Sequence, residues 1–250
     1  CVITCYTSGK TVFQGKDANI YAAAFMDEPV APTTTTSMSQ YPQAGSDEVG
    51  TGDYFGPVCV CASYVTKDDI DFLVKLGVRD SKKLTDADML KIGPQLMEKI
   101  PHSLLIVTPQ KYNQVHKENN LNTIKAKLHN QAYINLAKKI NLPSFKIIDQ
   151  FTPESLYYRY IKNEPQIIRG IHFETKAEDK YLSVAVGSII SRYGFLKAWE
   201  EMEQKYDITF PKGSGDKVDI LAQEFVDRYG FERLGEVAKL HFKNTEKIRV

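Results

Sequence analysis

The sequence has little of what marks several classes of protein. Cysteine is scarce, with four in 250 residues, and neither close pair has the spacing of a zinc site or of a disulfide framework. No apolar run approaches the length of a membrane span, and the first residues lack a basic segment followed by an apolar one. We therefore expect a cytoplasmic protein in which Cys59 and Cys61 are free thiols on one face of a buried strand.

The chain also lacks an excess of either charge. Its 32 Lys and Arg residues balance 31 Asp and Glu residues, so the net charge of +1 neither requires nor excludes a nucleic-acid partner. The distribution is less even, because residues 119–148 contain no acid. This stretch predicts either a positive surface suited to a polyanion or a solvated helix face. Its basic residues are Lys125, Lys127, Lys138, Lys139 and Lys146.

The first part of the chain has the pattern of a fragment. Residues 1–26 alternate like two short strands joined by a turn at Ser8 and Gly9, and the chain opens on Cys1 rather than methionine. Because two strands alone are marginal in water, we expect the remnant of a small, truncated domain. Residues 27–43 are rich in Pro, Thr and Ser and predict a flexible linker to a main body at residues 44–250.

The most informative stretch is residues 45–57, GSDEVGTGDYFGP. The adjacent carboxylates of Asp47 and Glu48 stand in what the pattern predicts to be a loop with four glycines. Side-by-side acids repel when ionised, and glycines weaken backbone order, so a bound cation or phosphate would explain the combination. Carboxylates are suitable ligands for Mg²⁺, whereas a polar hairpin turn is the structural alternative.

The rest of the main body alternates strands with helices. Strands are predicted at residues 58–65, 103–109, 145–149 and 166–174, and helices after Thr85, at 122–140, at 178–206 and up to 229. Thr85 and Asp88 fit a capping box. The strand at 145–149 delivers Asp149 at its carboxyl end, where α/β folds place their sites. Asp179 falls in the first turn of the long helix, where helix capping is an alternative role.

Small residues follow in that helix and allow it to lie close against a sheet, which would bring Asp179 toward the acids at the strand ends. They are Ser183, Ala185, Gly187, Ser188 and Ser191.

Two further polar segments are ambiguous on their own. Residues 80–83 place Ser81, Lys82 and Lys83 next to Asp80, which suits either a bound phosphate or a solvated turn. The basic and aromatic residues of the tail, 238–250, suit either a nucleic-acid backbone or docking of the C-terminal segment.

Taken in order, these segments resemble the type 2 ribonucleases H, and within them bacterial ribonuclease HIII. The similar segments span most of residues 44–250: GSDEVGTGDYFGP, RDSKKL, KIID, EDKYLSVAVGSIISR and HFKNT. The resemblance implies an α/β fold with a mixed five-stranded sheet flanked by helices. It also implies that residues 1–26 belong to a substrate-binding domain similar to the TATA-binding-protein fold.

The resemblance further implies the chemistry. Asp47, Glu48, Asp149 and Asp179 would hold two Mg²⁺ or Mn²⁺ ions and hydrolyse the RNA strand of RNA/DNA hybrids, leaving 5′-phosphate and 3′-hydroxyl ends. Backbone amides of Gly50, Thr51 and Gly52 would contact the ribose 2′-hydroxyl. Ser81, Lys82 and Lys83 would hold phosphates. Thr51 stands where the HII type has arginine, from which we expect poor cleavage at single ribonucleotides.

Asp47 and Glu48 follow one another, and consecutive strand residues point to opposite faces. Both can therefore reach one site only where the strand ends or bends.

Two other functions remain open from the sequence, with a monomer expected in each case. An actin-like or sugar-kinase-like phosphotransferase also opens with acids and glycines after a first strand, but such enzymes generally need two related domains. A catalytically idle module could bind hybrid duplex through its basic face, although four acids near a polyanion would weaken binding unless metal ions neutralise them.

Overall fold

The computed structural model describes residues 2–5, 11–14, 40–78 and 83–249. The chain divides into two units, Cys1–Ser39 and Gln40–Val250. In the first unit, strands β1 (Val2–Cys5) and β2 (Thr11–Gln14) pair antiparallel, with Val2 opposite Gln14. The predicted turn at residues 8–9 and most of the predicted linker lie outside the described residues. The end of that predicted linker, Gln43, is the first residue of a strand in the second unit.

The second unit is built on a mixed five-stranded sheet, as predicted. Its strand order is β5-β4-β3-β6-β7, with β4 antiparallel to both β3 and β5, and with β6 and β7 parallel to β3. The central strand β3 therefore has an antiparallel neighbour on one side and a parallel one on the other. The strands are β3 (Gln43–Val49), β4 (Val58–Val65), β5 (His102–Val107), β6 (Phe145–Asp149) and β7 (Ile171–Glu174).

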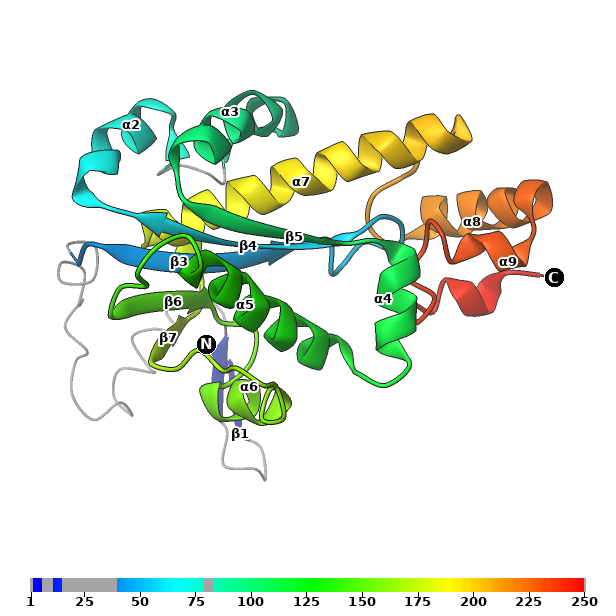
Figure 1. Cartoon of the computed structure of the whole chain (residues 1–250). Coiled ribbons are helices and arrows are strands. Elements are labelled where there is room, and N and C mark those ends of the chain that lie inside the picture. The colour runs from blue at the N-terminus through cyan, green and yellow to red at the C-terminus, as the bar shows by residue number, and fades with distance from the viewer. Residues whose placement is uncertain (1, 6–10, 15–39, 79–82, 250) are drawn as a thin grey trace. The chain divides into compact units, whose positions relative to one another are not determined.

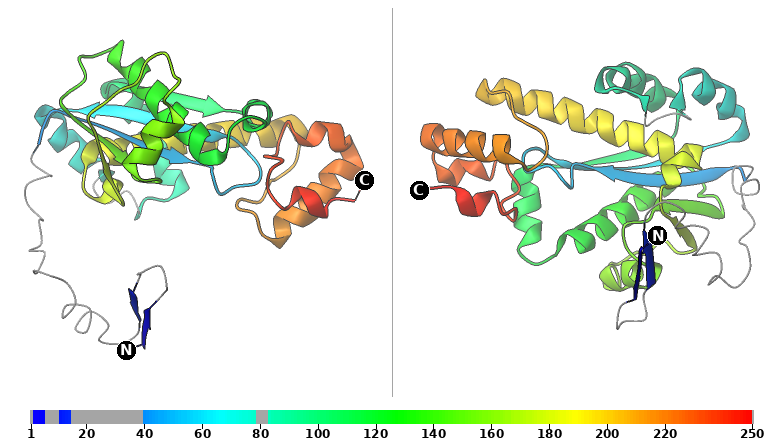
Figure 2. Two further views of the ribbon diagram at one scale, coloured as in Figure 1. Left: turned by 90° about the horizontal axis from the view of Figure 1, so that it is seen from below. Right: turned by 180° about the vertical axis from the view of Figure 1, so that it is seen from behind.

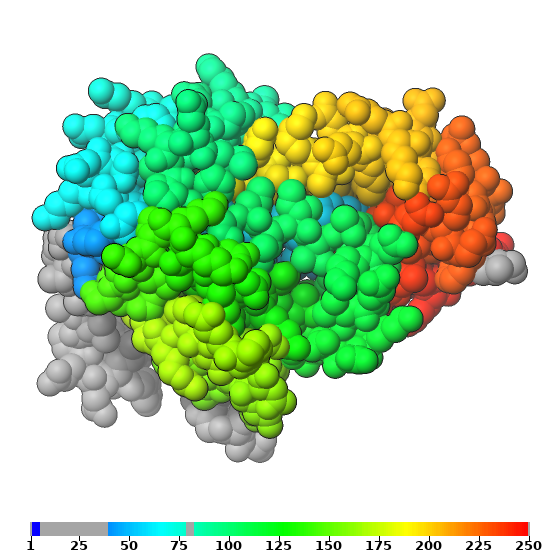
Figure 3. Space-filling model, viewed as in Figure 1, coloured from blue at the N-terminus to red at the C-terminus, as the bar shows by residue number. Residues whose placement is uncertain are grey.

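Helices cover both faces of this sheet. The long helix α7 lies on one face together with α2 and α3, while α5 and α6 lie on the other (Figures 1 and 2). In the space-filling view of Figure 3, these helices hide most of the sheet. Their bounds are α2 (Ile70–Lys75), α3 (Asp86–Lys99), α5 (Leu121–Ala137), α6 (Glu154–Tyr160) and α7 (Leu182–Tyr206).

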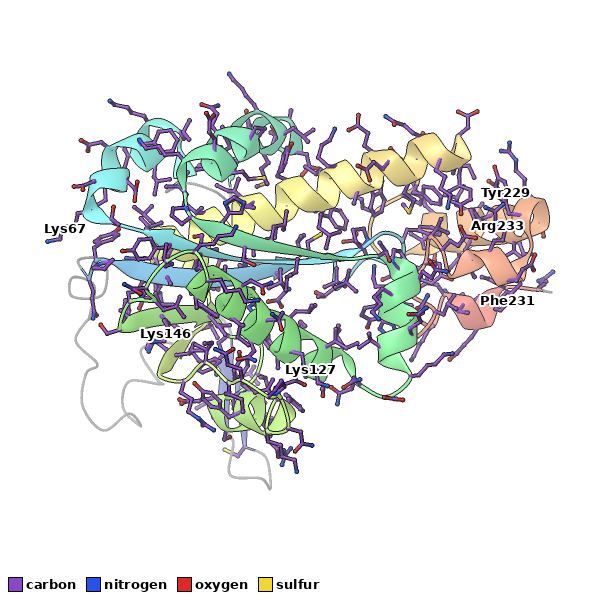
Figure 4. The ribbon with its side chains drawn as sticks, in the orientation of Figure 1. Lys67, Lys127, Lys146, Tyr229, Phe231 and Arg233 are labelled. Atoms are coloured by element: carbon purple, nitrogen blue, oxygen red, sulfur yellow. The ribbon has the colours of Figure 1, made fainter. Side chains whose placement is uncertain are left out.

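Three more helices gather at one end of the sheet (Figure 1). They are α4 (Pro109–His116), α8 (Asp216–Tyr229) and α9 (Phe231–Leu234). Short 3₁₀ turns complete the body at η2 (Lys67–Asp69), η4 (Ala177–Asp179) and η5 (Thr245–Lys247). In this C-terminal region, the guanidinium of Arg233 lies 5.7 Å from the ring centre of Tyr229, and Figure 4 shows both beside Phe231.

The close packing expected of α7 is confirmed by the glycines on both sides of the contact. A methyl group added to Gly45 of β3 would lie 2.4 Å from the Val184 amide nitrogen. One added to Gly187 of α7 would lie 2.9 Å from the Cys61 carbonyl oxygen. Both distances are below any real carbon contact, so only glycine fits at this separation of helix and sheet.

Local signals explain most element ends. The Thr85 side chain and Asp88 form the predicted capping box at the start of α3. The strand predicted at 103–109 ends at Val107, because Thr108 caps α4 and Pro109 occupies the first position of that helix. The strand predicted at 166–174 is shorter and begins at Ile171.

The tail docks onto the body. Lys239 is fully buried, and its ammonium donates to the carbonyl oxygens of Phe55, at 3.1 Å, and Gly56, at 2.6 Å. The Tyr54 hydroxyl lies 3.0 Å from the Thr245 hydroxyl. The docking interpretation of the basic tail is therefore supported, since its buried Lys239 donates hydrogen bonds to the turn that follows β3.

Candidate active site

Asp47 and Glu48 lie within strand β3, which corrects the prediction of a loop. The antiparallel ladder to β4 continues through Glu48, opposite Val60, and Val49, opposite Cys59. The parallel ladder to β6 stops earlier, at the pair of Ser46 with Ile148. The strand itself therefore does not end at the two acids, but its β6 side is open there. This opening replaces the strand end that we expected to let both acids reach one site.

Asp47 belongs to the face of β3 that meets α7. It is 8% exposed, and its Oδ1 accepts a hydrogen bond from the Glu48 amide at 2.7 Å. Burial raises the pKa of Asp47 to about 8, with a further contribution from the charge of Glu48, while a hydrogen bond from Ser188 of α7 acts in the opposite direction. Without a bound cation, this carboxyl group therefore holds its proton at neutral pH.

Glu48 belongs to the opposite face, which meets α5. Its Oε1 lies 2.7 Å from the Lys125 ammonium, and its Oε2 lies 2.8 Å from His129 Nε2. Burial acts to raise the pKa of Glu48, but the hydrogen bonds and charges of His129 and Lys125 outweigh it and place the pKa below its ordinary value. Glu48 is therefore ionised where its neighbour Asp47 is not.

Asp149 is the last residue of β6, one position beyond the end of the ladder to β3. Its Oδ1 accepts a hydrogen bond from the Ala177 amide at 2.9 Å, which ties the strand end to the η4 turn. Burial raises the pKa of Asp149, and the charges of Glu178 and Glu48 add to that rise. Electrostatics thus connects three acids across the open end of β3 and β6, because Asp149 also raises the pKa of Asp47.

The structure changes the setting of Asp179. The helix predicted at 178–206 is interrupted, because Tyr181 has an extended backbone and α7 begins only at Leu182. The Tyr181 hydroxyl is held by Glu174 at 2.5 Å, which fixes this break. Asp179 therefore ends η4 instead of standing in the first turn of α7, and it is exposed. Its neighbour Glu178 is half-buried and acts on Asp149.

These acids surround one region without converging on a single point. Among residues 40–78 and 83–249, no three histidine, cysteine, aspartate or glutamate side chains are arranged to hold a metal ion. Glu48 turns to Lys125 and His129, and Asp47 keeps a proton. Both features reduce repulsion among the acids. The donor set itself, carboxylate oxygens from two strands and a turn, suits Mg²⁺ or Mn²⁺.

The turn after β3 is tightly determined. Gly50 has a φ of +88°, and a methyl group there would lie 2.2 Å from the Pro57 carbonyl oxygen, so glycine is required. Thr51 is half-buried, whereas Gly52 is exposed with open space around it. Asp53 anchors the turn by accepting a hydrogen bond from the Gly213 amide at 2.6 Å. The three residues proposed to read ribose thus lie on a fixed turn with an open side.

The remaining predicted site residues are less defined. Lys83 is exposed just before α3, whereas Ser81 and Lys82 lie outside the described residues. The predicted basic surface of residues 119–148 is partly wrong. Lys125 is buried against Glu48, and Lys127 lies 3.2 Å from Glu164. Lys127 and Lys146 project from separate parts of the body (Figure 4).

Sequence reasoning missed four residues around the acids: Lys125, His129, Glu178 and Ser188. One signal was available for the first two, because residues 125 and 129 are one helical turn apart and share a face of α5. Ser188 was noted for its size and not for its hydroxyl. Glu178 directly precedes Asp179, and the sequence alone does not distinguish their roles. The observed backbone does.

Comparisons with known proteins agree with this architecture. The family model for ribonuclease HII matches residues 44–245, and a domain of unknown function, DUF3378, matches residues 1–38. Ribonuclease HIII of Bacillus mycoides (strain KBAB4) is 43% identical over 264 residues, which cover 99% of this chain and 85% of that protein.

Solved structures give the same result. Bst-RNase HIII in complex with Mn²⁺ is 39% identical, with a TM-score of 0.83 and coverage of 98% of this chain and 84% of that one. A mutant form of the same protein has a TM-score of 0.81 at the same identity and coverage. RNase H3 of Aquifex aeolicus, 24% identical with a TM-score of 0.66, shares the fold.

The mixed five-stranded sheet, with acids where its central strands separate, defines a nuclease of the ribonuclease H type, an endoribonuclease of RNA/DNA hybrids. The chain belongs to the ribonuclease HII family, and proteins similar to it over nearly its whole length include ribonucleases HIII of Bacillus species.

Proposed function

We propose that the protein cleaves the RNA strand of RNA/DNA hybrids at the opening between β3 and β6, leaving 5′-phosphate and 3′-hydroxyl ends. Asp47, Glu48 and Asp149 would hold the divalent ions together with a carboxylate of the η4 turn. The observation that carries the proposal is that Asp47 and Glu48 lie just beyond the last β3–β6 pair, Ser46 with Ile148, where Asp149 ends β6.

The residues present fit two Mg²⁺ or Mn²⁺ ions. Such ions supply activation of the attacking water and neutralisation of charge on the phosphate and the leaving oxygen. The chain contributes carboxylates in two different states, since Glu48 is already ionised and Asp47 must release a proton before it can act as a ligand. Asp149 is oriented by the Ala177 amide, which donates a hydrogen bond to its Oδ1 at 2.9 Å.

The fourth carboxylate is either Asp179, as the sequence suggests, or Glu178. The structure favours Glu178, because its charge reaches Asp149 and its side chain is half-buried, while Asp179 is exposed. The two substitutions Glu178→Gln and Asp179→Asn separate these assignments. We expect cleavage to fall at least about 100-fold for Glu178→Gln and less than about threefold for Asp179→Asn. The reverse pattern would restore Asp179 as the ligand.

Substrate contacts remain as proposed from the sequence. Amides of Gly50, Thr51 and Gly52 would contact the 2′-hydroxyl, which is the group that distinguishes RNA from DNA. Ser81, Lys82 and Lys83 would bind phosphates, so substituting Lys83 should weaken hybrid binding in a salt-dependent manner. A duplex with a single ribonucleotide, compared with a full hybrid, tests the poor cleavage expected from Thr51.

The decisive experiment is cleavage of an end-labelled RNA/DNA hybrid in Mg²⁺, in Mn²⁺ and in chelator. We expect cleavage that depends on either metal and is lost in Asp47→Asn. Hybrid binding without any cleavage would instead support the idle binding module. The phosphotransferase alternative has lost its support, because residues 40–78 and 83–249 hold one five-stranded sheet and match a nuclease family.

The cellular setting is a smaller part of the proposal. Among the residues that the structure describes, none of the helices has the length and hydrophobicity needed to cross a membrane. A cytoplasmic location and a monomeric state remain predictions from the sequence, and sedimentation of the purified protein would test the second.

A further inference from the structure

His129 of α5 connects Ser46 and Glu48 of β3 through two hydrogen bonds. His129 is fully buried, and its two ring nitrogens are both engaged: Nδ1 with the Ser46 hydroxyl and Nε2 with Glu48 Oε2 at 2.8 Å. Ser46 and Glu48 are two residues apart in β3, so their side chains project from the same face. A single imidazole therefore bridges two positions of the strand that carries the acids.

The ring of His129 has little freedom to move. It stacks on Phe151, with ring centres 5.4 Å apart and planes inclined by 20°. Ser46 is fully buried as well, so the whole chain is shielded from solvent except at the Glu48 carboxylate, whose side chain is 11% exposed. Because a carboxylate oxygen accepts from Nε2, this nitrogen carries a proton, while Nδ1 accepts from the Ser46 hydroxyl when the ring is neutral and donates to it when the ring is charged. The arrangement fixes both the ring and its hydrogen bond.

From this geometry we infer that His129, anchored by Ser46, is a positioning residue that sets the orientation of the Glu48 carboxylate toward the metal ions. The inference rests on the proposed function, in which Glu48 is a metal ligand. Oε2 has a second lone pair, so a hydrogen bond from His129 does not prevent this oxygen from binding a cation. Partners that orient ligands in this way commonly affect metal affinity about 10- to 100-fold.

Lys125 contacts the same carboxylate but differs from His129 in kind. Its ammonium lies 2.7 Å from Oε1 and 4.0 Å from the ring centre of Phe151. As a cation, it offsets the charge of Glu48 and also repels an incoming metal ion. Removing Lys125 therefore loses a contact that orients Glu48, but it also relieves the repulsion of the metal ion. Lys125→Met should accordingly weaken Mn²⁺ binding less than removal of His129 does.

The test measures Mn²⁺ binding to the full chain by calorimetry without substrate, alongside the thermal midpoint and the Mn²⁺ dependence of hybrid cleavage. His129→Leu removes both hydrogen bonds, while His129→Gln keeps an N–H donor. Lys127→Met is a matched control, because Lys127 lies on the same helix (labelled in Figure 4) but points to Glu164, 3.2 Å away, with its side chain 37% exposed.

We expect His129→Leu to weaken Mn²⁺ binding about 10- to 100-fold, with cleavage partly recovered at high Mn²⁺ concentration. His129→Gln should lie between His129→Leu and the unsubstituted protein, and Lys127→Met should bind Mn²⁺ normally. If His129→Leu lowers only the thermal midpoint and keeps normal Mn²⁺ affinity, His129 is a packing residue and the inference is overturned. If Glu48→Gln also binds Mn²⁺ normally, the proposed metal site fails instead.

Discussion

Residues on the two faces of β3 meet different neighbours. Gly45 and Asp47 face α7, where small residues bring the helix backbone against the strand. Ser46 and Glu48 face α5, where long side chains from the helix reach across to them. The first environment raises the pKa of Asp47 chiefly by burial, and the second gives Glu48 a lysine and a histidine. Adjacent acids of the same chemistry therefore have pKa values shifted in opposite directions.

The difference shows how a cluster of acids can exist before a cation binds. If both neighbours were ionised in the same buried space, their repulsion would oppose folding. Here one acid keeps a proton and the other is paired, so the folded state carries less unbalanced charge. Substitutions of the two acids should therefore have similar effects on catalysis and different effects on folding stability.

We expect the largest effect when each acid is neutralised in turn, which tests the difference between the two faces of β3. Asp47→Asn and Glu48→Gln should each lower hybrid cleavage at least about 100-fold, as expected for ligands whose supporting partners alone affect activity about 10- to 100-fold. Stability should change in opposite directions. Asp47→Asn removes an acid that costs free energy to bury, whereas Glu48→Gln leaves Lys125 buried without its partner, which costs roughly 3 kcal/mol.

Thermal unfolding in chelator measures this second effect, beside initial rates of hybrid cleavage. Two substitutions that both lowered the midpoint would show that Asp47 is not strained by its environment. The Asp53→Asn substitution, at the other carboxylate of the motif, is a control that should retain the metal dependence of cleavage.

A smaller effect tests the α7 face alone. Gly45→Ala would place a methyl group 2.4 Å from the Val184 nitrogen and 2.6 Å from the Ser183 carbonyl carbon. Because these are backbone atoms, α7 must shift, and we expect a loss of about 3 kcal/mol, or roughly 6–12 °C in the thermal midpoint. Gly52→Ala is the matched control, since nothing lies within 4 Å of an added methyl group there. Equal midpoints for both variants would contradict the close packing.

Much of this framework could be predicted from the sequence because its signals are local. Alternating and apolar runs located β4 and β6, capping residues located the start of α3, and small residues indicated the close approach of α7. The same patterns indicated Asp47, Glu48 and Asp149 as candidate ligands, and the resemblance joined them with Asp179 in one site. Each of these features depends on residues near one another in the chain.

The environment of the acids was not predictable, because it depends on contacts between distant segments. The sequence predicted Lys125 to be part of a positive surface, whereas in the fold it contacts Glu48, 77 positions earlier in the chain. The choice between Glu178 and Asp179 depends on a break at Tyr181 that is set by its contact with Glu174. The helix predicted to begin at residue 178 begins at Leu182, so Asp179 leaves its expected place in the first helical turn.

The smallest effect sharpens the comparison through pH. The pKa of Asp47 is about 8 in the folded protein and near 3.8 when unfolded, so the folded state holds a proton that the unfolded state loses between these values. The contribution of Asp47 to the free energy of unfolding is therefore fully present below about pH 4 and declines as the pH rises toward about 8. Asparagine at this position does not titrate. The thermal midpoint of Asp47→Asn minus that of the unsubstituted protein, measured in chelator from about pH 5 to about pH 9, should increase with pH up to about pH 8 and level off above it. A difference that stays constant over this range would mean that Asp47 is ionised throughout, and that its face of β3 treats a carboxylate no differently from the face that holds Glu48.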